Sequence, residues 1–407
     1  GPEERMKQPL LIRRRYGRCP REWSEELWEK VCPEGQPRLT EEAWEHIMEN
    51  AKKGKRGGVI GINHDHCIGS EALQTVRKRI VKVAIEIGVR WTEMDVTPMI
   101  AIPKVGKRYI GDVKAVRFIT PREAVGKDVQ AYLWWATGTQ TLVREGTFGT
   151  TAAGGVPGGS VMSNILVFRA FCEDAKQFKK RGAVLFADEY KGYDRQSTMK
   201  VLQEFVMRAP PEALLALVCE CLGRTKVQVL TAYGYTKPFW RGNGEDQGGV
   251  DSPHWFNVGN IEESRDIDRV LRERGGYFMG ENNEGVMITK KSYVDDVNVY
   301  AAEAGVEEEI GNVMGHGMQR VLNMMALRCK FFEEGYAVEK MYVMAVGEEQ
   351  EEWDRLQFMG QLVKRVTVEE AQRVLGAKMS GDLNTEYQGQ KAKEDVQEQM
   401  QNARRRV

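Results

Sequence analysis

The chain has 407 residues, and 59 Lys and Arg are balanced by 59 Asp and Glu, so its formal net charge at pH 7 is zero. The length exceeds the ~250–300 residues that one hydrophobic core serves, and 42% hydrophobic residues suffice for buried cores, so we expect a globular chain of about two or three subdomains. The charge balance excludes a uniformly basic chain, which nucleic-acid-binding domains commonly are.

Cysteine usage and apolar runs bound the location of the protein. The cysteines are odd in number, irregularly spaced and not preceded by a signal peptide, which predicts a reduced, intracellular protein, cytoplasmic or nuclear and not secreted. No apolar run approaches the ~20 residues of a membrane span, so no membrane partner is expected. The cysteines are Cys19, Cys32, Cys67, Cys172, Cys219, Cys221 and Cys329.

Apolar residues at helical spacing predict helices through residues 1–100, which we interpret as an N-terminal helical extension. The expected helices are Glu22–Cys32, Thr40–Asn50 and Ser70–Ile87, separated by prolines and a glycine-rich stretch. In residues 101–180 we expect a strand at Ala115–Thr120 and a helix at Pro121–Trp135.

The rest of the chain alternates strands and helices. An apolar strand ends at Asp188, and helices at Thr198–Arg208 and Pro211–Leu222, then a strand at Lys226–Ala232, are expected after it. Ser252-Pro253 predicts a helix start, since serine caps free amides and proline suits the first turn; this helix runs to about Arg265. Later elements are a helix at Glu307–Leu327, a strand at Met341–Val346, and charged helices at Thr367–Leu375 and Lys391–Arg405.

Two acidic segments far apart in the sequence carry the candidate chemistry. Asp188 ends the apolar run 185–187. Asp295-Asp296 stands between strand-forming residues in the segment 292–297, as expected at the tip of a hairpin. A lone Asp-Asp pair also suits an ordinary tight turn. Two strands that each end in carboxylates, however, can aim them at one point.

Such a group of carboxylates suits phosphoryl transfer. Two Mg²⁺ ions ~3.5–4 Å apart can stabilise both the attacking 3′-oxygen and the departing pyrophosphate. Each Mg²⁺ takes only one or two carboxylates besides water and substrate phosphates, so Asp188, Asp295 and Asp296 suffice as ligands.

A third segment, Gln247–Asn257, lies between the acidic ones and reads Gln-Gly-x-x-x-Ser-Pro-x-x-Phe-Asn. In this order the three segments resemble reverse transcriptases of non-LTR retrotransposons and group II introns, whose first segment reads Phe-x-Asp-x-x-Lys-Ala-Phe-Asp and whose third reads Tyr-Ala-Asp-Asp-Val. Upstream, 102–107 and 116–119 are similar to the family's fingers segments Ile-Pro-Lys-Pro-Gly-Lys and Arg-Pro-Ile. Downstream, Phe358-Met359-Gly360 is similar to the Tyr-Leu-Gly turn of the primer grip. The resemblance covers roughly residues 95–362.

The resemblance implies an α+β right-hand polymerase fold with an antiparallel palm sheet and packed helices. Fingers would occupy 101–180, and the palm 181–362 with a fingers insertion around 225–250. Residues 363–407 would be a partial thumb or C-terminal helical tail, so further domains or partner proteins that supply a thumb or a nuclease are expected. The implied activity is RNA-directed DNA polymerase, with an RNA template, a DNA or RNA primer, deoxynucleoside triphosphates, and Mg²⁺ or alternatively Mn²⁺.

Roles follow from the resemblance residue by residue. Asp188, Asp295 and Asp296 would be the metal ligands and catalytic residues. The cations that neutralise the incoming triphosphate would be Lys104 or Lys107, together with Arg117, whose guanidinium offers a bidentate fork. Close backbone approach to the template and primer would occur at Gln247 and Gly248. The primer grip would comprise Phe358, Met359 and Gly360. Lys330 and Lys340 remain alternatives for a lysine that assists pyrophosphate departure.

Tyr193 carries the expectation about sugar choice. It stands five positions after Asp188, where viral RNA polymerases usually have an acidic residue that accepts the ribose 2′-hydroxyl. A ring below the sugar leaves no space for that hydroxyl and favours deoxynucleotides. The alternative interpretation is a half-buried core aromatic.

Two departures from the family pattern leave competing functions open. Gly249-Val250-Asp251 stands where Asp-Pro-Leu is usual, and the segment 148–155 lacks the family's template-contacting arginine. The first competitor is a viral or virus-like RNA-dependent RNA polymerase. The second is a domesticated, non-catalytic scaffold that binds RNA. Three mutually repelling carboxylates weigh against the scaffold, because they destabilise a fold that has no cation to hold.

Overall fold

The computed structural model describes residues 25–51, 62–88, 96–104, 115–144, 146–148, 151–223, 225–281, 285–302, 317–347, 351–367, 372–374 and 377–379. It is a mixed α+β protein, which confirms the predicted class. The chain forms two compact units: unit 1 is Gly1–Gly149 with Lys191–Ile261, and unit 2 is Thr150–Tyr190 with Glu262–Val407. Within the described ranges, no helix combines the length and apolar character that crossing a membrane requires.

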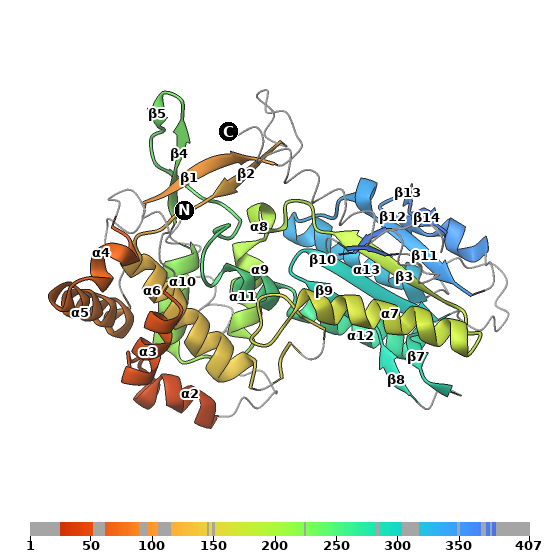
Figure 1. The fold of residues 1–407 in the computed structure, drawn as a ribbon, viewed down its shortest axis with the longest axis horizontal. Coiled ribbons are helices and arrows are strands. Elements are labelled where there is room, and N and C mark those ends of the chain that lie inside the picture. The colour runs from red at the N-terminus through yellow and green to blue at the C-terminus, as the bar shows by residue number, and fades with distance from the viewer. Residues whose placement is uncertain are drawn as a thin grey trace, which may run out of the picture. The chain divides into compact units, whose positions relative to one another are not determined.

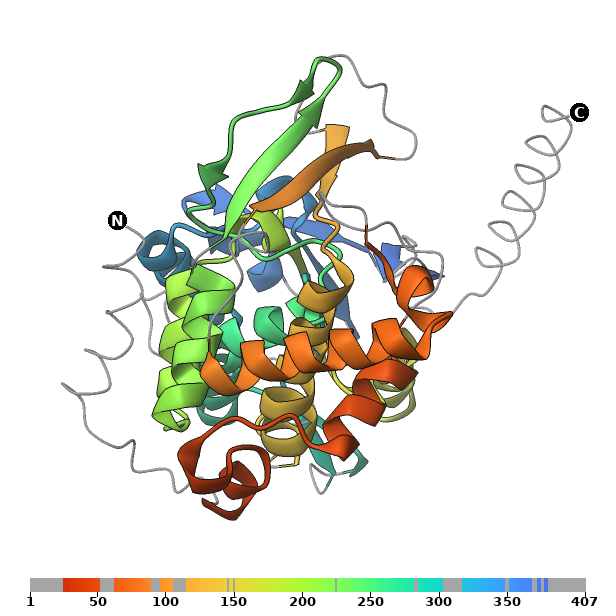
Figure 2. The same ribbon diagram turned by 90° about the vertical axis from the view of Figure 1, so that its left-hand side faces the viewer.

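Helices make up most of unit 1 (Figures 1 and 2). Those expected in the N-terminal region are confirmed, and each of the two longer ones begins at a side-chain cap: Thr40 accepts from the amide of Ala43, and Ser70 from that of Leu73. The elements are α2 (Glu25–Val31), η1 (Pro33–Gly35), α3 (Glu41–Glu49), α4 (His64–Ile68), α5 (Glu71–Ile87), α6 (Ala124–Leu133), η4 (Trp134–Leu142), α8 (Gly192–Arg195), α9 (Thr198–Val206), α10 (Glu212–Gly223) and α11 (Ser252–Gly259).

Unit 1 also carries a sheet in the order β2-β1-β4-β5, with β6 pairing the same edge of β4 as β5. β1 is antiparallel to β2 and parallel to β4. The strands predicted at Ala115–Thr120 and Lys226–Ala232 are therefore confirmed. The strands are β1 (Val96–Pro103), β2 (Val116–Ile119), β4 (Lys226–Thr231), β5 (Gly234–Tyr235) and β6 (Phe239–Trp240).

Unit 2 is built on a sheet in the order β14-β11-β3-β10-β9. The central strand β3 is antiparallel to β10 and β11, whereas the edge strand β14 is parallel to β11. The expected fully antiparallel sheet is thus antiparallel in its middle and mixed at one edge. The strands are β3 (Gly182–Asp188), β9 (Lys290–Tyr293), β10 (Asp296–Ala302), β11 (Tyr342–Val346) and β14 (Lys364–Val366).

Helices cover both faces of this sheet. On one face, Leu185 and Val299 pack against α12 (Ile261–Arg274) and α13 (Gly317–Phe332). On the other, Val184 and Phe186 pack against α7 (Val161–Gln177), which crosses the sheet in Figure 1. Because strand side chains alternate, Asp188 belongs to the α7 face. Smaller elements are β7 (Tyr277–Met279), β8 (Val286–Ile288), η7 (Val338–Lys340), η8 (Glu351–Arg355), β12 (Gln357–Phe358), β13 (Gln361–Leu362), β15 (Gln372–Val374) and β16 (Ala377–Met379).

Three predicted helices differ from the structure. The helix expected from Ser252 to Arg265 is broken at Asn260, whose side chain accepts a 2.7 Å hydrogen bond from the buried Lys200 ammonium. The helix from Pro121 continues as the π-helix η4. A helix over Thr367–Leu375 is wrong, because Gln372–Val374 pairs with Ala377–Met379 as a short antiparallel ladder. Residues 307–316 and Lys391–Arg405 lie outside the described residues.

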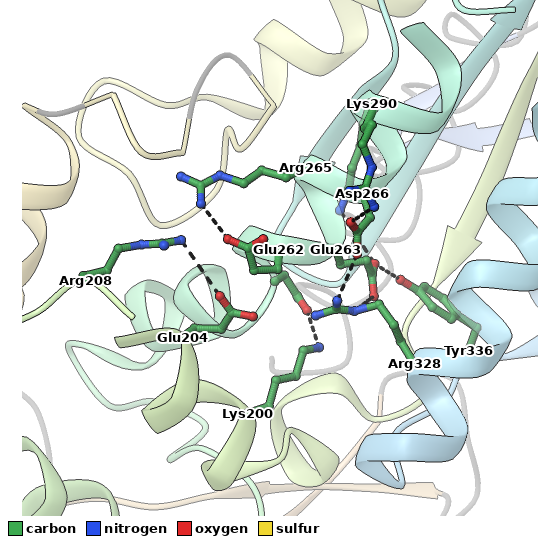
Figure 3. Close-up of polar contacts among 12 residues, drawn as sticks. Lys200, Glu204, Arg208, Glu262, Glu263, Arg265, Asp266, Lys290, Arg328 and Tyr336 are labelled. Carbon is green, nitrogen blue, oxygen red and sulfur yellow. Dashed lines mark hydrogen bonds and ion pairs between the residues drawn. The ribbon is translucent and has the colours of Figure 1, made fainter. Parts of the chain in front are cut away.

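A buried polar cluster ties α12 to α13 and β9 in unit 2 (Figure 3). The Tyr336 hydroxyl donates to Glu263 at 2.6 Å, and Lys290 Nζ lies 3.7 Å from the same carboxylate. Arg328 reaches Asp266 at 3.2 Å. A buried charge is tolerated only when it is paired in this way. Because the partners come from different elements, the cluster holds α12 and α13 against the sheet.

Substitution of Asp174 on α7 tests how much one buried carboxylate contributes to the stability of unit 2. It accepts from the Tyr277 hydroxyl at 2.8 Å and from the Gly280 amide at 2.6 Å, and Lys180 lies 3.2 Å away. Asp174→Ala leaves these donors unsatisfied, so we expect a loss of about 2–4 kcal/mol in the free energy of unfolding, measured by urea titration. The control Glu173→Ala removes an exposed ion pair with Arg169 and should cost less than about 1 kcal/mol. Equal effects of the two substitutions would contradict this assignment.

Candidate active site

The second acidic segment forms the hairpin that the sequence predicts. Tyr293 on β9 pairs with Asp296 on β10, which leaves Val294-Asp295 as a two-residue turn. Val294 has φ +55°, a left-handed conformation that β-branched residues rarely adopt. Gly154 accommodates it, because a Cβ at Gly154 would lie 2.8 Å from Val294 Cγ2. The strained turn is held by its surroundings in unit 2.

The β3–β10 register brings the two acidic segments together. Asp188 is the direct cross-strand partner of Asp296. Side chains opposite each other on antiparallel strands share a face, with Cβ atoms ~4.5–5.5 Å apart. The Glu189 amide also donates to the Asp295 carbonyl at 3.0 Å, which fixes the turn against the end of β3. Carboxylates remote in sequence thus meet at one end of a strand pair.

Lys340 provides the cation next to this pair. Its ammonium forms an ion pair with Asp188, and the preceding backbone is held by a 2.9 Å hydrogen bond from the Ala337 amide to the Asp188 carbonyl. The Lys340 side chain is 58% exposed, so it can leave the carboxylate at little cost. Burial and the nearby Asp296 carboxylate raise the pKa of Tyr342 on β11.

The pair fits a divalent ion in kind. Mg²⁺ takes hard oxygen ligands and needs only one or two carboxylates per ion, and Asp188 and Asp296 offer such oxygens on one face. In the part of the chain that the structure describes, however, no three His, Cys, Asp or Glu side chains converge tightly enough to hold a metal ion. The described geometry therefore supports a two-carboxylate pair, with Asp295 at the adjacent turn.

The candidate nucleotide-binding residues that are described lie in unit 1, and several of them gather around Asp194. Burial of the carboxyl group raises the pKa of Asp194, although the residue as a whole is exposed, and four cations oppose this rise. The cations are Lys191, Lys104, Arg241 and Arg117. These cations lie near one carboxylate, and Arg241 also forms an ion pair with Asp246. Lys107 lies outside the described residues.

Gln247 and Gly248 join Arg117 through the end of β2. The Thr120 amide donates to the Gln247 carbonyl at 3.1 Å. With its amide oriented to satisfy both neighbours, the Gln247 side chain donates to the Phe118 carbonyl at 3.0 Å and accepts from Arg117 Nε at 3.3 Å. Gly248 has φ +104°, a conformation that favours glycine. Gln247 and Gly248 therefore lie next to the end of β2 that carries Arg117.

Tyr193 lies half-buried on α8, with its ring centroid 5.2 Å from that of Phe256 on α11. The packing of the Tyr193 ring on Phe256 agrees with the alternative that Tyr193 is a core aromatic. The ring is also partly exposed, so a ligand can contact it. Both interpretations of Tyr193 are compatible with this position.

Phe358, Met359 and Gly360 form a tight hairpin in unit 2. β12 pairs with β13 across the Met359-Gly360 turn, and both turn residues have positive φ, +50° and +78°. The Gln319 side chain on α13 bonds the amide and the carbonyl of Gln357, each at 2.8 Å. Phe358 is buried next to Tyr336, so the hairpin is anchored and the turn exposes Met359.

Sequence reasoning missed a buried charged cluster beside Gln247. Asp246 forms ion pairs with Arg122 and Arg241, which hold its pKa well below the usual range. Burial raises the pKa of Glu245 to about 8 and that of Asp251 to about 7. The Asp251 carboxyl accepts from the Trp255 indole at 2.8 Å. The acidic pair 245–246, directly before Gln247-Gly248, was the feature of the sequence that could have revealed this cluster. The cluster holds the segment that begins at Gln247 in place.

No protein-family model matches the chain, and comparison with curated proteins likewise finds no match. The functional interpretation therefore depends on the geometry of the site and on the motifs in the sequence.

Asp251 gives a pH test of this cluster. Its pKa rises from ~3.9 in an unfolded chain to about 7 in the fold, so its stabilising contribution is complete below the unfolded value and is lost as pH rises through about 7. Asp251→Asn cannot titrate. We expect the unfolding free energy of the variant, relative to the wild type, to increase between about pH 4 and 7, by at most about 1.4 kcal/mol per pH unit. Urea unfolding across this range measures it, and a constant difference would refute a buried, protonated Asp251.

Proposed function

We propose that the protein is a metal-dependent nucleotidyl transferase of the reverse-transcriptase type, which extends a DNA or RNA primer on an RNA template. The observation that carries the proposal is the pairing of Asp188 with Asp296, because it unites the two motifs that suggested this chemistry. The hairpin turn that bears Asp295 adds a third acidic residue beside them.

The chemistry of the proposal is electrostatic. Bound Mg²⁺ or Mn²⁺ would be held by Asp188 and Asp296, with Asp295 adjacent, and would supply charge stabilisation to the attacking and departing oxygens. Lys340 is the better candidate than Lys330 for the lysine that assists pyrophosphate departure, since its ammonium already lies at Asp188. A charged amine there can release its contact with the carboxylate and donate a proton to the leaving group.

Unit 1 supports the nucleotide part of the proposal. Lys104 and Arg117 are assigned to the triphosphate from the motifs that contain them, and both lower the pKa of Asp194 in the same unit. Lys107 shares this assignment from its motif alone. Gln247 and Gly248 are assigned to the template and primer, and the Met359-Gly360 turn to the primer grip, on the resemblance of their segments.

A non-catalytic RNA-binding scaffold is the second candidate, and one observation favours it. The Lys340 ion pair neutralises Asp188 without a metal. It therefore reduces the repulsion between Asp188 and Asp296, and with it the need for a bound metal cation. A viral-type RNA polymerase remains the third, and nucleotide choice separates it from the first.

Primer extension on an RNA template tests the catalytic assignment. Asp188→Asn and Asp296→Asn should each reduce the Mg²⁺-dependent extension rate by about 100-fold or more, since each removes charge that holds the ion. Binding of the primer–template should persist. The control Asp354→Asn removes an exposed ion pair with Arg365 in the same unit and should retain activity. A fully active Asp188→Asn or Asp296→Asn variant would rule out the two-carboxylate site, and a wild type that binds without extending would favour the scaffold.

Tyr193 tests the choice of sugar. Tyr193→Ala should raise ribonucleotide incorporation relative to deoxynucleotide incorporation, because the ring no longer excludes the 2′-hydroxyl. Tyr193→Phe keeps the ring and should discriminate like the wild type. The ratio of the two incorporation rates is the measurement, since partial unfolding lowers both rates equally. An unchanged ratio in Tyr193→Ala would leave Tyr193 as a core aromatic that packs on Phe256, and exclusive ribonucleotide use by the wild type would favour the RNA polymerase.

A further inference from the structure

The strands β4, β5 and β6 of unit 1 expose large aromatic rings. Tyr233, in the turn between β4 and β5, is fully exposed, and Tyr235, Phe239 and Trp240 are 43%, 48% and 41% exposed. Every residue from 231 to 240 is exposed. Figures 1 and 2 both show the β4–β5 hairpin extending away from the helices of unit 1. Exposed rings gathered in this way mark a binding surface more often than isolated apolar residues do.

The strand register places several of these side chains on one face of the sheet. Trp240 pairs with Lys226, and Tyr235 with Leu230, which are on the same side of β4 because they are four residues apart. The same row continues from Leu230 through Ile100 to Ile119 on β2. Ile102 on this face pairs with the exposed Arg117. We call this surface the aromatic face; it is formed by Tyr235, Trp240, Lys226, Leu230, Ile102 and Arg117.

The charge of this surface selects a polyanion. The sequence contains no Asp or Glu between Glu220 and Glu245, and none in β1 or β2. Lys226 Nζ lies 4.6 Å from the centroid of the Trp240 ring, and Lys237 is exposed between β5 and β6. Rings interspersed with cations, on strands that carry no Asp or Glu, suit a strand of stacked bases with a phosphate backbone. An acidic protein partner lacks the flat bases that Tyr233, Tyr235 and Trp240 can stack.

We propose that the aromatic face, with the Tyr233 turn, binds single-stranded nucleic acid by stacking bases on its rings. The proposal deepens the proposed function, because that function makes the strand an RNA template; the stacking itself depends only on the exposed rings and their charge. Lys226 and Lys237 are assigned to the phosphate backbone. Stacking accepts any base, so binding should show little sequence preference.

The experiment measures binding of the full-length protein to a short, fluorescein-labelled single-stranded RNA of mixed sequence by fluorescence anisotropy. Tyr233→Ala, Tyr235→Ala and Trp240→Ala should each weaken binding by about 5- to 150-fold, the loss expected for one stacked base. Tyr233→Phe and Tyr235→Phe keep the rings and should bind like the wild type. Ile87→Ala, on an exposed position of α5 in the same unit, is the control for loss of exposed apolar surface.

Salt dependence separates stacking from charge. Lys237→Gln should reduce the slope of log binding constant against log salt by about 0.7, the value for one phosphate contact on a single strand, whereas Tyr233→Ala should leave the slope unchanged. A blunt duplex, whose bases are already stacked, should bind more weakly than the single strand. Single-stranded DNA of the same sequence tells whether the strand must be RNA.

Two results would overturn the proposal: a wild type that does not bind the single strand, or alanine variants that bind within about twofold of the wild type while Tyr233→Ala remains folded. The fully exposed Tyr233 side chain makes unfolding an implausible cause of any loss. Primer extension keeps the two proposals apart. If the alanine variants lose RNA binding but the wild type does not extend a primer, the polymerase is contradicted and the aromatic face is supported. If the wild type extends a primer and the alanine variants still bind RNA, the polymerase is supported and the aromatic face is contradicted.

Discussion

The register between β3 and β10 is the constraint on which the site depends. It runs without interruption from the Asp188–Asp296 pair to the Gly182–Ala302 pair, and both strands are buried between α7 on one face and α12 with α13 on the other. A shift of one residue would turn every side chain to the opposite face. The buried side chains of β3 and β10 therefore determine both the packing of the core and which carboxylates lie opposite each other. The stability of the sheet offsets the repulsion between these carboxylates.

The cation beside the carboxylates gives the site its particular character. Lys340 ends η7, two residues before β11, and reaches Asp188 from the side of β3 that pairs with β11. Its ion pair offsets the repulsion between Asp188 and Asp296, yet it is exposed and can exchange for another cation. The same residue explains how the carboxylate pair is stable without a metal, and in the proposed function its displacement would let the pair accept one. In unit 1 the buried Asp246 has a comparable arrangement, with two arginines that hold it ionised beside Gln247.

The sequence predicted most of this organisation where the signal was local. Apolar periodicity and capping residues were sufficient for α3, α5 and β11, and the acidic motifs were sufficient for the β9–β10 hairpin. What the sequence could not supply were contacts between distant segments. The break at Asn260 depends on a lysine sixty residues earlier, and the strand at Gln372 depends on a partner strand that composition does not reveal. The aromatic face could not be predicted from the sequence, because aromatic residues of the same types also form buried cores. Only the exposure of their side chains distinguishes the two.

The central claim is that Asp188 and Asp296 jointly hold a divalent ion. An anomalous-scattering map of crystals grown with Mn²⁺, a primer–template and an incoming nucleotide tests it most directly. The account predicts an anomalous peak about 2 Å from oxygens of both carboxylates, close to the Mg²⁺ ligand distance, with the Lys340 ammonium displaced from Asp188. A peak at neither carboxylate, with Lys340 still paired to Asp188, would contradict it.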